Sequence, residues 1–430
     1  MRVRLESIGC RLNTGEIEAL GRRLAAGGHQ LVGPGEDADL CIFNSCTDTQ
    51  TASRKSRQAL RQLRRGHPGC TLVATGCFAE LAAADVRSLG VDLVVGNLDK
   101  DRIPELLQDR GLLLPTGSPV DNDPSPRITG ERTRAFLKVQ DGCDNRCTFC
   151  VVTLARGSGR SLPADRVVAE VAGLVRSGYR EVVHSGVHLG SYGHDLGERR
   201  GLERLVRRVL EDTGVERLRL SSLEPWDLEP GFFELFANPR LLPHLHLPLQ
   251  SGCDSTLRRM ARRTDRASFA SLLAAARAAV PGLAISTDVM VGFPGETDEE
   301  FSQSLAFVEQ MAFSRLHVFR YSARPGTAAA SMSARVPAAV SQERSRSMLA
   351  LGEQLEAAFC RRLVGTTAEV LWEEAEDRTA RQRFSGLTGS YVRVFCDAQD
   401  GDDLTNRITA TRLVRHVPGG MEGEVVGRAR

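Results

Sequence analysis

The sequence predicts an α/β protein built from a small parallel α/β domain, a central (β/α) partial barrel and a small C-terminal antiparallel β-barrel. Three observations predict this fold class. Strand-like and helix-like segments alternate from the first residues to about residue 115, the alternation restarts near residue 131, and short strand-like segments follow one another beyond about residue 361. A stretch rich in Pro, Gly, Asp and Ser separates the first two parts and is typical of a linker. The predicted boundaries are 1–115, 116–130 for the linker, 131–360 and 361–430.

In the first domain, apolar runs predict parallel strands and amphipathic stretches such as Thr14–Ala26 predict helices between them. A cysteine follows each of the first three strands, namely Cys10, Cys46 and Cys77. Ligands of open parallel sheets bind beyond the carboxyl ends of the strands, so we expect these three thiols to converge on one metal site. The predicted strands are Val3–Ile8, Asp39–Asn44, Thr71–Thr75 and Val91–Val95.

The central domain is predicted from about six βα units, which indicate a parallel barrel. Chemistry in such barrels lies at the C-terminal ends of the strands. Gly186, Ser222, Gln250 and Asp288 lie at or near those ends and are candidate cofactor-binding residues. The predicted strands are Phe136–Val139, Glu181–His184, Arg217–Leu220, His244–Leu247, Ala284–Met290 and Arg315–Phe319.

Three closely spaced cysteines follow the first strand of this domain: Cys143, Cys147 and Cys150, in the pattern C-x3-C-x2-C. Thiolates are soft ligands that suit iron–sulfur clusters and zinc. Three of them can hold a cubane cluster and leave its fourth iron open for a substrate or cofactor. One alternative is a zinc knuckle, although the next histidine, His184, is distant. The other is one cysteine face of a buried helix, because positions i, i+4 and i+7 share a side.

Composition restricts the partners and the location. The formal net charge is +2, so bulk charge indicates neither a nucleic-acid nor an acidic partner. The basic helix that contains Arg54, Lys55 and Arg57 is a candidate phosphate contact, with a solvated helix face as the alternative. There are 11 cysteines and neither a signal-like N-terminus nor an apolar run near the roughly 20 residues that cross a bilayer. We therefore expect a monomer of the cytoplasm with no membrane association.

The third domain is predicted from short alternating segments with Gly and Asp turns. Small barrels of this kind often bind RNA, and a purely structural cap is the alternative. The predicted strands are Ala368–Trp372, Phe384–Leu387, Tyr391–Phe395, Ile408–Leu413 and Glu424–Val426.

Nearly the whole chain resembles the radical S-adenosylmethionine methylthiotransferase family. The resemblance is carried by motifs in the expected order: Gly9–Cys10, Asn44–Thr47, Thr75–Cys77, Gln140–Cys143, Phe149–Cys150, Arg156–Gly157, Leu245–Gly252, Gly292–Thr297 and Tyr321–Thr327. Lys55–Gln58 and Leu316–Phe319 are most similar to the MtaB group, which acts on N6-threonylcarbamoyladenosine beside the tRNA anticodon. The tail resembles the TRAM-like RNA-binding barrel of the family more loosely. Thr153, Cys253 and Arg320 depart from the usual residues of the family, which are proline, an acidic residue and proline.

The resemblance implies two [4Fe–4S] clusters and S-adenosylmethionine. Cys143, Cys147 and Cys150 would hold the cluster that cleaves S-adenosylmethionine to a 5′-deoxyadenosyl radical, which takes hydrogen from carbon 2 of the adenine. The second cluster, on the N-terminal cysteines, would carry the sulfur to be inserted. The implied partners are a tRNA anticodon loop and an electron donor such as flavodoxin or ferredoxin.

Three rival functions remain open from the sequence. Sibling enzymes methylthiolate isopentenyladenosine in tRNA or an aspartate on a ribosomal protein, and they share both cysteine sets. Arg324 stands where the aspartate-directed sibling has an acidic residue, which favours a tRNA substrate. The rival of another class is an iron–sulfur RNA-binding protein without enzymatic activity.

Overall fold

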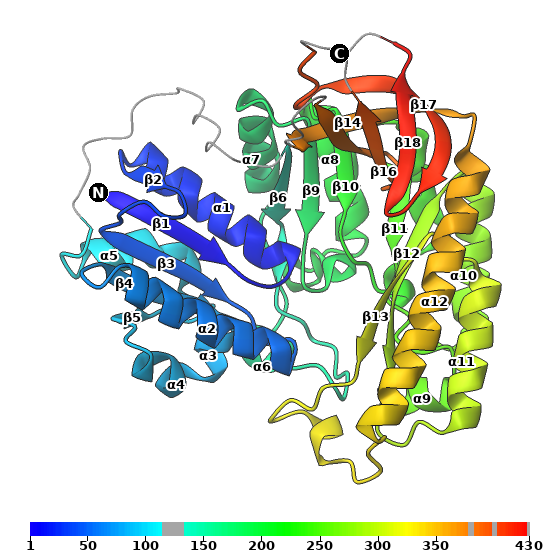
Figure 1. Cartoon of the computed structure of the whole chain (residues 1–430), viewed down its shortest axis with the longest axis horizontal. Helices are drawn as coiled ribbons and strands as arrows, with labels where there is room; N and C mark the ends of the chain where they lie inside the picture. The colour runs from blue at the N-terminus through cyan, green and yellow to red at the C-terminus, as the bar shows by residue number, and fades with distance from the viewer. Residues whose placement is uncertain (114–132, 377–381, 398–401, 428–430) are drawn as a thin grey trace.

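The computed structural model describes residues 1–113, 133–376, 382–397 and 402–427. The predicted linker at 116–130 lies outside these residues. Figure 1 shows a sheet with flanking helices at the N-terminal end, a second sheet beside it, and a small barrel at the C-terminal end packed against the second sheet. The predicted fold class is confirmed.

The N-terminal sheet is parallel, with strand order β2-β1-β3-β4-β5. Every residue of β3 is buried, because helices cover both faces of the sheet. Ile42 points to the face covered by α1 and α5, and Phe43 to the face covered by α2, α3 and α4. The bounds are β1 Arg2–Ser7, α1 Arg11–Ala26, β2 Gln30–Val32, β3 Leu40–Ser45, α2 Gln50–Gly66, β4 Thr71–Gly76, α3 Cys77–Leu81, α4 Ala83–Ser88, β5 Leu93–Val94 and α5 Ile103–Gln108.

This strand order creates a place for a ligand. The chain runs from β1 to the edge strand β2 and returns to β3 on the other side of β1. The carboxyl ends of β1 and β3 therefore flank a topological switch point, where ligands of doubly wound sheets bind. Cys10 and Cys46 follow those two strands directly. The edge strand β2 was not predicted, because three residues give too short an apolar pattern.

The central sheet contains all six predicted strands, and all its neighbouring pairs are parallel. Two three-stranded sheets, β6-β9-β10 and β11-β12-β13, are joined by bridges between Leu218 and Leu241 and between Ser222 and His246. Within the described residues β6 and β13 do not pair, so the barrel is partial. The bounds are β6 Arg134–Lys138, β9 Glu181–Ser185, β10 Arg217–Leu220, β11 His244–His246, β12 Ala284–Val291 and β13 Arg315–Arg320.

The helices of the central domain bury their apolar sides in one large core with these strands. The long α12 runs along β13 beside α10 and α11 (Figure 1). The bounds are α6 Val152–Arg156, α7 Ala164–Arg176, α8 Gly201–Asp212, α9 Asp254–Arg259, α10 Arg266–Ala279, α11 Asp298–Met311 and α12 Ala338–Leu363.

Helix α1 of the N-terminal domain packs against β6, the edge strand of the central sheet (Figure 1). The contact is tight at Gly15, where an added Cβ atom would lie 2.5 Å from the carbonyl oxygen of Phe136. Only glycine lets the helix backbone approach this closely. The N-terminal domain is thereby fixed beside the open edge of the partial barrel.

The C-terminal strands form a closed barrel in the order β14-β15-β16-β18-β17. Four neighbouring pairs are antiparallel and β16 with β18 is parallel, so the expectation of a purely antiparallel barrel is wrong at that pair. Tyr391 was expected to begin a strand, but it lies in the turn before β16 with φ 67°. The bounds are β14 Thr367–Glu376, β15 Arg383–Thr388, β16 Arg393–Asp397, β17 Ile408–Val417 and β18 Gly420–Val425. The described helices include none long and apolar enough to span a membrane.

Candidate functional site

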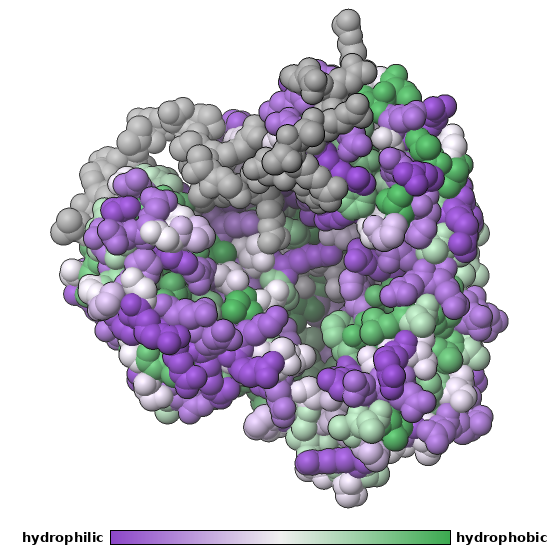
Figure 2. Space-filling model, viewed as in Figure 1, coloured by the Kyte–Doolittle hydropathy of each residue, from purple (hydrophilic) through white to green (hydrophobic). Residues whose placement is uncertain are grey.

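A cavity of about 590 Å³ opens between the N-terminal and central domains. Figure 2 shows the hollow between the two halves of the molecule. It is lined on one side by the three N-terminal cysteines, Cys10, Cys46 and Cys77, and on the other by strand ends of the partial barrel, including Gly186, Ser222 and Asp288. Thiols that are separated by up to 67 positions in the chain (77 minus 10) therefore face one space.

The fourth predicted cofactor residue, Gln250, is not among the described residues that line this cavity. It is buried with φ 73°, and its backbone N–H donates to the carbonyl oxygen of Asp288 at 2.8 Å. Gly186 is hemmed in, since an added Cβ atom would lie 2.9 Å from Oε1 of Gln140. Glycine at 186 therefore lets the chain just beyond β9 lie directly against Gln140.

Two glycines bring the N-terminal cysteine loops together. Gly9 has φ 123°, and a Cβ atom there would lie 2.8 Å from Sγ of Cys46, so the loop that carries Cys10 crosses directly over Cys46. Gly76 has φ 94°, and its Cβ atom would lie 2.3 Å from the carbonyl oxygen of Ser45. A side chain at either position would push the loops apart.

Two asparagines, which sequence reasoning did not assign, hold the same loops in register. Nδ2 of Asn13 donates to the carbonyl oxygens of Ile8 and Ser45 at 2.9 and 3.1 Å, and so joins the Cys10 and Cys46 loops. Nδ2 of Asn44 donates to the carbonyl oxygen of Asn13 at 3.0 Å. Both side chains are buried. Asn44 belongs to the Asn44–Thr47 motif, which was the available sequence signal.

The thiols of this set are poor nucleophiles as they stand. Burial, followed by the charge of Asp48, raises the pKa of Cys10 to about 11 although its side chain is exposed to the cavity. Burial also raises the pKa of Cys46 and of Cys77, while Arg156 opposes the rise at Cys77. Neutral buried thiols are inert toward substrates, whereas a bound metal deprotonates its cysteine ligands. The donor chemistry therefore fits metal ligation.

The second set of cysteines lies in the loop that leads from β7 (Gln140–Asp141) to α6. The loop from 143 to 150 is not helical, so the alternative of a helical cysteine face is wrong. Backbone bonds fix it: the N–H of Cys143 donates to the carbonyl oxygen of Gly157 at 3.0 Å, and that of Cys150 to Cys147 at 3.1 Å. Burial raises the pKa of Cys147, and it raises the pKa of Cys150 to about 12.

An arginine stands beside this second set. Nη1 of Arg262 lies 3.8 Å from Sγ of Cys147, and its guanidinium pairs with Glu224 at 2.6 Å. His188, at the end of β9, pairs with Asp227 through Nε2 at 2.6 Å. Burial lowers the pKa of His188, but the bonds to Asp227 and Cys143 raise it to about 10 overall. Two positive side chains therefore face the loop, which favours thiolates and an anionic cluster there.

Cys143, Cys147 and Cys150 are not among the described residues that line the cavity, but Val152 and Arg156 of α6, just beyond them, do line it. Asp48, two residues beyond Cys46, is among the charges that raise the pKa of Cys150. Nδ2 of Asn97 in the N-terminal domain donates to the carbonyl oxygen of Ala155 at 2.6 Å. In the described parts of the chain no three His, Cys, Asp or Glu side chains converge as ligands of one metal ion. A [4Fe–4S] cluster binds each cysteine through a different iron, so its thiolates stay further apart than the ligands of one ion.

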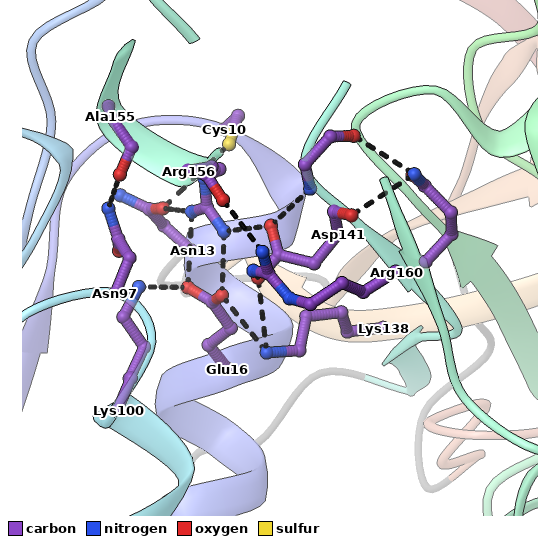
Figure 3. Close-up of polar contacts among 12 residues, drawn as sticks. Cys10, Asn13, Glu16, Asn97, Lys100, Lys138, Asp141, Ala155, Arg156 and Arg160 are labelled. Atoms are coloured by element: carbon purple, nitrogen blue, oxygen red, sulfur yellow. Dashed lines mark hydrogen bonds and ion pairs between the residues drawn. The ribbon is translucent and has the colours of Figure 1, made fainter. Parts of the chain in front are cut away.

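A buried network of charges fixes the N-terminal domain to the central one (Figure 3). Arg156 donates through Nη1 to Glu16 at 2.9 Å and to Asp141 at 2.8 Å, and through Nη2 to Oδ1 of Asn13 at 2.8 Å. Lys100 pairs with Glu16 at 2.6 Å. Burial would raise the pKa of Glu16, but Lys100 and Arg156 hold it well below its usual value. The network joins α1 to α6 directly behind the cavity.

Two of the three predicted RNA-binding residues are available on the surface of α2. Arg54 and Lys55 are exposed. Arg57 is half-buried, pairs with Asp85 at 3.1 Å and stacks over the ring of Phe78 at 4.8 Å. Its guanidinium is therefore already engaged beside Cys77.

Comparison with known proteins places two families on this chain. The Radical SAM superfamily matches residues 137–308, and the Uncharacterized protein family UPF0004 matches residues 2–96. The chain is 35% identical over 425 residues to the threonylcarbamoyladenosine tRNA methylthiotransferase MtaB of Bacillus subtilis, covering 96% of this chain and 94% of the relative. It is 36% identical over 401 residues to the enzyme of the same name from Thermotoga maritima, covering 91% and 90%.

A second kind of relative is a tRNA-2-methylthio-N(6)-dimethylallyladenosine synthase from Frankia casuarinae, 36% identical over 396 residues, covering 89% of this chain and 73% of the relative. Among solved structures, the radical S-adenosylmethionine methyltransferase TsrM from Kitasatospora setae, with cobalamin and a [4Fe–4S] cluster bound, superposes with a TM-score of 0.57. The match covers 76% of this chain and 77% of that one at 15% identity, which supports the fold alone.

Proposed function

We propose that this chain, which belongs to the MtaB-like family of radical S-adenosylmethionine methylthiotransferases, adds a methylthio group to carbon 2 of N6-threonylcarbamoyladenosine next to the anticodon of tRNA. The observation that carries the proposal is one cavity lined by the N-terminal cysteines, by strand ends of the partial barrel, and by Val152 and Arg156 of α6, which follows the second cysteine loop. Radical formation and sulfur transfer must act on one base, so both cysteine sets must reach one space.

In this proposal the barrel loop holds one [4Fe–4S] cluster on Cys143, Cys147 and Cys150, and the N-terminal domain holds a second on Cys10, Cys46 and Cys77. Bound to the first cluster, S-adenosylmethionine supplies a carbon radical strong enough to take hydrogen from an aromatic carbon. Gly186, Ser222 and Asp288 would border the cofactor. Gln250 would support the cofactor site indirectly, because its backbone hydrogen bonds hold it against β12.

In this proposal, side chains of the protein position the two domains, the first cluster and the RNA. Arg156 and Glu16 hold the two domains at one spacing, and Arg262 places a positive charge beside Cys147. Arg54 and Lys55 would contact phosphates of the anticodon stem-loop, with Arg57 contributing from beside Phe78. An electron donor such as flavodoxin or ferredoxin is needed to reduce the first cluster. We also predict that the protein is a monomer and that it lies in the cytoplasm.

The test is an iron count coupled to product analysis. Anaerobically reconstituted protein should hold about eight irons, and Cys10→Ala/Cys46→Ala/Cys77→Ala should hold about four. That variant should still cleave S-adenosylmethionine when reduced, but its RNA should lack the methylthio group by nucleoside mass spectrometry. Cys143→Ala/Cys147→Ala/Cys150→Ala should lose both activities.

Three outcomes would contradict the proposal. An unchanged iron count in the N-terminal triple variant would leave a single-cluster enzyme. Wild-type protein that modifies isopentenyladenosine RNA but not threonylcarbamoyladenosine RNA would assign it to the sibling activity. Reduced protein that never cleaves S-adenosylmethionine would leave an iron–sulfur RNA-binding protein.

A further inference from the structure

Arg11 is a cation of the cavity that has no acidic partner among the residues that the structure describes. It is the first residue of α1, directly after Cys10, and it lines both the main cavity and a small recess of about 30 Å³ that shares His246 and His317 with it. Its Cζ atom lies 5.0 Å from the ring centroid of Tyr391. In the described parts of the chain no carboxylate lies within 4.0 Å of its guanidinium nitrogens.

The neighbouring arginines show that this is unusual here. Three guanidinium groups surround the Tyr391 ring, and the other two have carboxylate partners: Arg134 with Glu373 at 2.9 Å and Arg219 with Glu181 at 2.8 Å. The other arginine that lines the main cavity, Arg156, is bound to Glu16 and Asp141. Arginine presents a planar fork that matches a carboxylate through two parallel bonds. Within the described parts of the chain, no carboxylate takes up the fork of Arg11, which packs over the ring of Tyr391.

The surroundings of Arg11 favour an anion at this end of the cavity. Burial, followed by the charge of His246, lowers the pKa of His317 to about 4, so His317 is neutral near pH 7 and can donate an N–H. Three carboxylates line the two spaces, Asp48 and Asp288 in the main cavity and Glu356 in the recess. Asp288 is paired with Nε2 of His246 at 3.2 Å. A ligand carboxylate would therefore meet a guanidinium that has no carboxylate partner among the described residues.

We propose that Arg11 is the subsite for the free carboxylate of the threonylcarbamoyl group, and that it makes this enzyme prefer an acidic N6 substituent over an apolar one. The inference rests on the proposed function, because only that substrate carries a carboxylate on the adenine. The position beside Cys10 suits the role, since the sulfur donor and the modified base must meet at that cysteine. S-adenosylmethionine also has a carboxylate, and the experiment separates the two sources.

The experiment uses two anticodon stem-loop RNAs that differ in one group, N6-threonylcarbamoyladenosine and its primary carboxamide. Reconstituted wild type, Arg11→Gln and Arg11→Lys are compared by kcat/KM on each RNA. Wild type should favour the carboxylate by about 10- to 100-fold, the usual range for losing a charge-assisted bond. Arg11→Gln should lose that preference by slowing only on the carboxylate RNA, and Arg11→Lys should keep part of it.

Arg23→Gln is the matched control, because Arg23 lies on the same helix, is exposed and pairs with Glu105. Neither residue is among the described residues that line the cavity. It should behave as wild type. Cleavage of S-adenosylmethionine without RNA should have the same KM in Arg11→Gln and wild type, at equal iron content. A raised KM there would assign Arg11 to the cofactor and overturn the inference.

An unchanged carboxylate preference in Arg11→Gln would also overturn the inference. Failure of the proposed function is distinguishable, because then wild type itself would modify neither RNA.

Discussion

The central domain makes two interfaces, and both are built on buried charges. Toward the N-terminal domain, Arg156, Lys100 and Lys138 meet the carboxylates of Glu16 and Asp141. Toward the C-terminal barrel, Arg217 and Arg219 share Glu181, which is fully buried.

The two interfaces differ in which groups interact with the arginine side chains besides their carboxylate partners. At the C-terminal interface, Arg217 and Arg219 donate to backbone carbonyls, including those of Leu387 and Thr388, so the surplus is satisfied within the protein. At the N-terminal interface, the charge of Arg156 acts on Cys10 and Cys77 and opposes the rise of their pKa. One network therefore serves only to attach a domain, whereas the other attaches a domain and leaves positive charge for the proposed cluster.

The largest effect is expected for Glu16→Gln. This substitution removes the carboxylate shared by Arg156, Lys100 and Lys138 and leaves the buried Asp141, with the exposed Asp101 beside Lys138. Breaking a buried pair costs about 3–5 kcal/mol. Denaturant unfolding of the apoprotein should show this loss, and the reconstituted variant should retain less iron. Glu105→Gln removes an exposed partner of Arg23 and should cost under about 1 kcal/mol. A loss for Glu16→Gln as small as that of the control would break the comparison.

Glu181→Gln should destabilise the other interface without affecting iron. Burial would raise the pKa of Glu181, but Arg219 and Arg217 lower it from 4.5 to about 2. A lowered folded-state pKa stabilises the protein above about pH 4.5, and the contribution, about 3 kcal/mol, is lost as the pH falls toward 2. The wild type should therefore lose its advantage over Glu181→Gln across that window. The comparison would fail if the free energies of unfolding of wild type and Glu181→Gln changed in parallel with pH. It would also fail if Glu181→Gln lost iron, because the two networks would then not be separate.

The smallest effect is expected for Gly15→Ala, which tests close backbone contact rather than charge. Its methyl group would collide with the carbonyl oxygen of Phe136, and such overpacking costs about 1–3 kcal/mol. Gly66→Ala is the matched control, because an added Cβ atom meets nothing within 4 Å there. Thermal unfolding of both variants measures the difference. Equal melting temperatures would mean that α1 is held on β6 by the charges alone.

Local sequence patterns predicted the strands of both sheets, apart from the three-residue edge strand β2, because each pattern is complete within a few residues. β3 reads as a continuous apolar run, since helices cover both its faces. The loop of Cys143, Cys147 and Cys150 was equally easy to single out as a candidate site, because its three cysteines lie within eight positions of the chain. Tyr391 was misplaced because an aromatic residue before an apolar run looks like a strand residue. In the structure its ring instead stacks on His244 and contacts the guanidinium groups of three arginines.

The pattern of residues alone was enough to predict the three-part fold class, the two cysteine sets and the family. Three features followed only from packing in three dimensions: Glu16 is buried under three cations, Arg57 is engaged with Asp85, and Arg11 has no carboxylate partner among the described residues. On an amphipathic helix these residues look alike, as polar positions that face water. Their charges acquire distinct roles only where packing brings a partner close or excludes the water, because an ion pair gains most of its strength from the low dielectric that tertiary packing creates.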